Sequence, residues 1–148
     1  MRYFALPLLL LSGCASTSNV PPSGLEFSLD GCTPFLNCVS STSTKSLYSV
    51  EPIRLAEPLD SSSWELIKAE ALKLSGASLN SARYGYADIT CYSDGVGFPD
   101  YFELLVDTIR QQLDVRSQSL LGFYDMGVNR ERVELLRSRL IERGIAVN

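Results

Sequence analysis

The chain has no histidine among its 148 residues. Nucleophilic sites that pair serine or cysteine with histidine therefore cannot be built. Zinc sites with histidine ligands are excluded too, and the cysteines are too few for an all-cysteine site. No glycine-rich phosphate loop occurs either, so the sequence predicts no cofactor and no metal.

Clusters of basic residues are also missing. The chain carries 13 lysines and arginines against 17 acidic residues, and its formal net charge is −4. Binding to a phosphate backbone requires clustered cations. We therefore expect no nucleic-acid partner.

No apolar run is long enough to cross a membrane as a helix, which needs about 20 residues. A short apolar run, Tyr3 to Leu11, follows Arg2 and leads directly into Ser12-Gly13-Cys14. The ending Leu-Ser-Gly-Cys resembles the bacterial lipobox, in which the cysteine thiol is acylated. We expect residues 1–13 to be a lipoprotein signal peptide and Cys14 to carry the lipid.

The lipobox predicts a bacterial cell-envelope lipoprotein whose fatty acids bind the membrane. In this class an Asp after the cysteine often retains the protein on the inner membrane. Ala15 therefore favours the outer membrane, facing the periplasm. Residues 14–31 have the polar, aperiodic composition of a tether, and residues 32–148 suit a single domain.

Three cysteines follow the predicted anchor, and thiols pair in an oxidising compartment. Cys32 and Cys38 are close in sequence and are the favoured disulfide, which leaves Cys91 as a buried free thiol. The alternative pairing joins Cys38 to Cys91 and would tie the N-terminal segment to the sheet.

Periodicity predicts one helix in the middle of the chain and one at its end. The first has Ser62 as its cap and Glu65 as the reciprocal capping-box residue, and it stops at Gly76. Its apolar face contains Trp64, Ile67, Ala71 and Leu74. The second is capped by Asn129 and ends at Gly144, with an apolar stripe of Val133, Leu136 and Leu140.

Between the helices we expect strands at 78–83, 84–92, 101–107 and 111–117, rich in aromatic and β-branched residues. The alternative for 101–107 is a helix that runs into Arg110. The fold class is therefore α+β, a small antiparallel sheet with two helices packed on one face.

Polar residues gather in two stretches, 37–41 and 116–132, and the second lies between a strand end and the start of the final helix. A helix N-terminus with nearby arginines favours anions, so we expect a shared site. The alternative is structural: Asp125 caps a turn, Asn129 caps the helix and an arginine pairs with Asp125. The candidate residues are Asn37, Ser40, Ser41, Arg116, Ser117, Asp125, Asn129 and Arg130.

The same stretches resemble the domain of unknown function 1499 family. The motifs are Asn-Cys-Val-Ser-Ser at 37–41, and Arg-Ser-x-Ser at 116–119 followed by Gly-x-x-Asp-x-Gly-Val-Asn-Arg-x-Arg at 122–132. The resemblance covers Cys32 to Ile145 and implies one extracytoplasmic domain with no assigned activity. The family pattern often has an Arg where this chain has Leu120, which weakens any site that needs that charge.

Two functions fit these observations. The first is a membrane-anchored, non-catalytic binding or structural module, with a small anionic ligand or an envelope protein as its partner. The alternative is a hydrolase with a Ser nucleophile, Ser40 or Ser41, and Lys45 as base. A lysine base must be buried to lose its proton near neutral pH.

Overall fold

The computed structural model describes Leu29, residues 31–32 and residues 34–148. The predicted signal peptide, Cys14 and most of the predicted tether lie outside these residues. Within the described part, neither helix is both long and apolar enough to cross a membrane.

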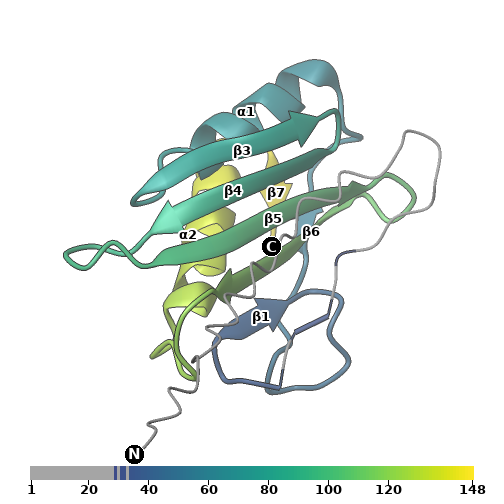
Figure 1. Cartoon of the computed structure of the whole chain (residues 1–148). Coiled ribbons are helices and arrows are strands. Elements are labelled where there is room, and N and C mark those ends of the chain that lie inside the picture. The colour runs from purple at the N-terminus through teal and green to yellow at the C-terminus, as the bar shows by residue number, and fades with distance from the viewer. Residues whose placement is uncertain (1–28, 30, 33) are drawn as a thin grey trace, which may run out of the picture.

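All the strand pairings are antiparallel and join seven strands into one sheet (Figure 1). The spatial order is β3-β4-β5-β6-β2-β7, and β1 pairs with β6 beside β2. The α+β class is confirmed, and residues 101–107 form a strand rather than a helix. The strands are β1 (Cys38–Ser40), β2 (Ile53–Leu55), β3 (Ala77–Arg83), β4 (Tyr86–Tyr92), β5 (Pro99–Asp107), β6 (Gln112–Ser119) and β7 (Ala146–Val147).

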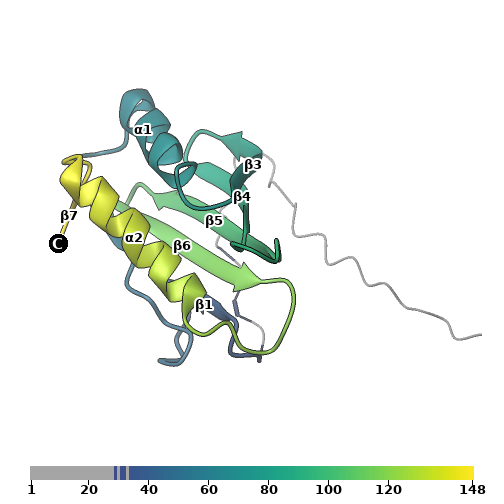
Figure 2. The same ribbon diagram turned by 90° about the vertical axis from the view of Figure 1, so that its left-hand side faces the viewer.

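The helices α1 (Ser61–Ala71) and α2 (Val128–Glu142) share one hydrophobic core with the sheet. Figure 2 shows both helical ribbons on the same side of the sheet. Burial of a large aliphatic or aromatic side chain contributes about 1.5–3 kcal/mol each. From the helices the core takes Trp64, Ile67, Ala71, Val133, Leu136 and Leu140.

The central strands are buried on both faces. In β4 every residue except Tyr92 is buried. Successive side chains in a strand point to opposite faces, so Ile89 joins the core while Asp88 lies on the other side. We call these two sides the helix side and the helix-free side of the sheet.

The helix caps differ from the prediction. Asp60, not Ser62, caps α1, because its carboxylate accepts from the amide of Ser63 at 2.7 Å and the Ser63 hydroxyl accepts from the Asp60 amide at 3.0 Å. Gly127, not Asn129, is the cap residue of α2. Its φ of 89° is a conformation that glycine adopts without strain.

The disulfide between Cys32 and Cys38 is confirmed, with Cα atoms 5.6 Å apart. Cys91 is a free, buried cysteine on the helix side of β4. Burial raises the pKa of its thiol, so the reactive thiolate is disfavoured.

Candidate functional site

The predicted polar cluster is divided by the sheet. Arg116 and Ser117 are consecutive residues of β6 and therefore point to opposite faces. Arg116 lies opposite Glu103 and Ser40 in the neighbouring strands, on the helix-free side. Ser117 lies on the helix side, where it meets α2.

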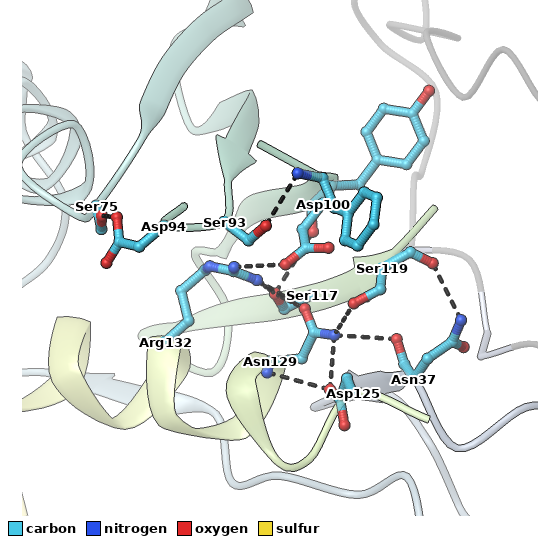
Figure 3. A network of polar contacts seen from close by, with 12 residues as sticks. Asn37, Ser75, Ser93, Asp94, Asp100, Ser117, Ser119, Asp125, Asn129 and Arg132 are labelled. Atoms are coloured by element: carbon cyan, nitrogen blue, oxygen red, sulfur yellow. Dashed lines mark hydrogen bonds and ion pairs between the residues drawn. The ribbon is translucent and has the colours of Figure 1, made fainter. Parts of the chain in front are cut away.

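Asn129 is the centre of the helix-side group (Figure 3). It is the second residue of α2 and is completely buried. Its side-chain oxygen accepts from the Ser117 hydroxyl at 2.6 Å and from Arg132 Nη1 at 2.7 Å. The side chain therefore binds the sheet instead of capping its own helix.

The side-chain amide nitrogen of Asn129, Nδ2, donates to three other groups. It reaches the carbonyl of Asn37 at 3.0 Å, the Ser119 hydroxyl at 2.9 Å and Asp125 Oδ2 at 2.7 Å. Asn37 in turn donates to the carbonyls of Ser119 and Gly122, at 3.1 and 2.7 Å. Through Asn37 the two sequence motifs meet, as Figure 3 shows.

Arg132 completes this group. Its Nη2 lies 2.6 Å from Asp100 Oδ2, and both side chains are buried. Its Nη1 also donates to the Ser117 hydroxyl at 2.8 Å. The spacing of Asn129, Arg132 and Val133 follows the buried stripe of α2, and that spacing was the signal that could have identified Arg132.

Asp125 caps the turn before α2, as the structural alternative supposed. Its carboxylate oxygens accept from the backbone amides of Gly127 at 3.0 Å and Asn129 at 3.1 Å. That alternative is wrong in two other respects. Asn129 does not cap the helix, and the buried arginines of the described chain pair with Asp100 and Glu103 instead of Asp125.

Besides Arg116, three more predicted members lie apart from the helix-side group. The exposed Arg130 donates to the carbonyl of Ser49 at 2.8 Å. Ser40 Oγ lies 2.9 Å from Thr42 Oγ1. Ser41 donates to Asp114 at 3.0 Å.

A second buried group occupies the helix-free side. Glu103 accepts from Arg116 Nη1 at 2.6 Å and from the Tyr86 hydroxyl at 3.1 Å. Arg116 also donates to Gln118. The signal for Glu103 in the sequence was a lone carboxylate inside the apolar stretch 101–106.

The pKa values of two buried side chains on this side, Asp88 and Tyr86, are raised. Asp88 lies directly opposite Glu103 across β4 and β5 and accepts from Asn80 at 3.3 Å. Burial raises the pKa of Asp88 above its ordinary value. Burial, followed by the charges of Glu103 and Asp88, raises the pKa of Tyr86.

In the helix-side group Ser117, Asn129 and Arg132 bond one another, whereas the buried side-chain oxygen of Asn37 has no hydrogen-bond partner. The Arg132 guanidinium has a carboxylate, a hydroxyl and an amide oxygen as partners. Among the described residues no set of three or more carboxylates and cysteines could hold a metal ion. Removal of one partner from a buried pair of this kind is strongly destabilising, because it leaves the other charge buried without a counterion.

The two motifs thus lie in an α+β domain. In this domain the N-terminus of α2 is bonded to the ends of the sheet strands and to the segment before β1. Residues 28–140 match the family described as protein of unknown function (DUF1499). The chain belongs to this family, and the family predicted from the motifs is confirmed. No curated protein and no solved structure matches the chain.

Proposed function

We propose that the protein is a lipoprotein of the bacterial envelope, anchored through Cys14, with a non-catalytic binding or structural module as its folded domain. The observation that carries the anchor is the run from Tyr3 to Leu11 that ends in Ser12-Gly13-Cys14. Small residues before the cysteine give a peptidase access, and acyl chains on its thiol give stable membrane binding. Ala15 favours the outer membrane, facing the periplasm.

The contacts of the family motif support a non-catalytic domain. Asn129, Ser117 and Arg132 are buried, and each bonds the other two. A catalytic or binding group must reach its substrate, whereas these buried groups bond one another and Asp100, Ser119, Asp125 and the carbonyl of Asn37. Their role on this proposal is to fix α2 against β5 and β6.

The hydrolase alternative has little support. Lys45 is exposed, so it lacks the burial that a lysine base requires. The hydroxyls of Ser40 and Ser41 are engaged by Thr42 and by Asp114. A ligand or partner is therefore better sought on another surface of the domain.

Fatty-acid labelling in the producing bacterium tests the anchor. Cells given a palmitate analogue should label the wild-type chain and the Cys91→Ala variant, which keeps Cys14. The Cys14→Ala variant should lose the label, because acylation requires that thiol. Label that persists in Cys14→Ala would show that the anchor is elsewhere or absent.

A further inference from the structure

Large apolar side chains are exposed together at one end of the domain. Met126 is 81% exposed and Phe123 is 72% exposed. Single exposed apolar residues are ordinary, whereas a contiguous group marks an interaction surface. We call this group the apolar end, which consists of Phe35, Leu36, Leu47, Leu121, Phe123, Tyr124 and Met126.

Two segments build the apolar end, and backbone contacts join them. Leu36 forms a β-bridge with Tyr124, and the amide of Asp125 donates to the Leu36 carbonyl at 3.2 Å. The rings of Phe35 and Phe123 pack edge to face, with centroids 4.9 Å apart. Leu47 and Met126 line a groove beside this contact.

The polar network behind the apolar end fixes its position. Asn129 in α2 donates to the Asn37 carbonyl and to Asp125 Oδ2, and Asn37 donates to the Gly122 carbonyl. Both segments are therefore bonded to the start of α2 at the base of the apolar end. The apolar side chains are exposed beyond this base and are not part of the core.

The charge of this region differs from that of the whole chain. Residues 34–49 and 117–130 contain only three charged residues, Lys45, Asp125 and Arg130, whereas the chain as a whole is acidic. The Asp125 carboxylate is already engaged by two backbone amides and by Asn129. Lys45 and Arg130 are exposed, so the region presents two cations.

The chain approaches the apolar end from the predicted anchor. Cys32 is bonded to Cys38, and Cys38 lines the same groove as Leu36 and Met126. Cys14 lies 18 residues before Cys32, so even a fully extended chain places this end within about 60 Å of the lipid. The predicted anchor thus joins the domain beside the apolar end.

We propose that the apolar end rests on the bilayer in which Cys14 is anchored, and this proposal depends on the lipid anchor proposed above. Aromatic and aliphatic side chains without net negative charge suit the interface between headgroups and acyl chains. Lys45 and Arg130 complement anionic headgroups. The contact orients the domain, so that one end faces the membrane and the β5–β6 turn faces away.

Tryptophan quenching by lipid tests this orientation. Full-length lipidated protein carrying Phe123→Trp is placed in vesicles of phosphatidylethanolamine and phosphatidylglycerol with brominated acyl chains. The native Trp64 is 2% exposed and supplies a constant background. The matched control is Ile109→Trp, at a position 93% exposed beyond the other end of β6.

We expect the emission of the new tryptophan to fall about twofold for Phe123→Trp and to stay unchanged for Ile109→Trp, because bromine quenches only nearby rings at the interface. Leu121→Trp should behave like Phe123→Trp and serves if that variant fails to fold. No quenching at 121 and 123, or equal quenching at 109, overturns the proposal.

Further results separate the membrane from other occupants and from the anchor. A concentration-dependent blue shift of Phe123→Trp without vesicles would assign the surface to a second copy of the chain and overturn the proposal. Labelled but unquenched protein overturns the membrane contact alone and leaves the anchor standing. Protein without fatty-acid label overturns the anchor and this proposal together.

Discussion

The two faces of the sheet each hold a buried arginine–carboxylate pair, and the two pairs have the same length but join different elements. On the helix side, Arg132 and Asp100 are 2.6 Å apart, and Arg132 also binds Ser117. On the helix-free side, Arg116 and Glu103 are 2.6 Å apart in adjacent strands. The first pair joins a helix to the sheet, whereas the second joins strands that already share a ladder of backbone hydrogen bonds.

The contrast shows that location decides what a buried ion pair does. The pair between β5 and β6 does little to fix their relative position, because backbone hydrogen bonds already set the register of these two strands. The helix-side pair is not backed by a ladder of backbone hydrogen bonds, since α2 packs on the sheet through its side chains. Buried polar networks contribute to a unique arrangement when every member is satisfied.

The largest expected effect comes from Asp100→Ala. Removal of the carboxylate leaves the Arg132 guanidinium buried without its counterion, which costs about 3–5 kcal/mol. Urea unfolding with the disulfide intact measures the loss. The control is Glu134→Ala in the exposed pair with Arg137, where we expect a change within about 0.5 kcal/mol.

Glu103→Ala provides the matched change on the other face. It also leaves a buried arginine, and both Arg116 and Arg132 keep other hydrogen bonds. We expect a smaller loss of about 2–3 kcal/mol, because β5 and β6 stay joined by their backbone ladder. Hydrogen exchange should separate the two variants. The amides of α2 should lose protection in Asp100→Ala and keep it in Glu103→Ala, and equal behaviour would remove the distinction between the faces.

A smaller effect is expected from a single hydroxyl. Ser117→Ala removes a partner of both Asn129 and Arg132, and we expect a loss of about 1–2 kcal/mol. Ser81, on the helix-free side, has a buried hydroxyl without a hydrogen-bond partner. Ser81→Ala should therefore be neutral or slightly stabilising, and thermal melts of the two variants make the comparison.

The smallest effect is the pH dependence of stability that comes from the buried carboxyl of Asp88. Its pKa is raised in the folded domain above the ordinary value of 3.8, so the folded state binds the proton more tightly than the unfolded chain does. The stability from this group is present below that ordinary value and is lost as pH rises through the folded pKa. Asp88→Asn should therefore be more stable than the wild type at neutral pH.

Urea titrations at about pH 7 and about pH 3.5 measure this linkage. The advantage of Asp88→Asn should largely vanish at the lower pH, where the wild-type carboxyl is mostly protonated in both states. Glu65→Gln, an exposed change in α1, serves as the control and should alter neither value. An Asp88→Asn advantage that persists at low pH would exclude ionisation as its cause.

The sequence predicted the regular elements because their patterns are strong and local. The spacing of Trp64, Ile67 and Ala71 predicted α1, and the strand interpretation of 101–107 is confirmed. The predicted cap of α1 was wrong because Asp60 and Ser62 are both good cap residues, and only the local backbone conformation decides between them. The short β7 carries too little periodicity to be recognised.

The site was predicted less well, since it depends on which face a side chain occupies. Alternation along β6 separates Arg116 from Ser117, and that rule was available before the structure. Ser40 and Ser41 lie near Asn37 in the sequence, but their hydroxyls bond Thr42 and Asp114 instead of the Asn129 group. Long-range partners of this kind follow from the packing of α2, which sequence spacing does not specify.

The edges of the sheet have a consequence for how copies of the chain can meet one another. The outer strand β3 contains a bulge between Leu79 and Ser81, and β7 has only two residues. Short or irregular edges offer few aligned backbone groups to a neighbouring chain. Copies of the chain would therefore pair poorly edge to edge, so the short and irregular edge strands disfavour fibril-like assembly.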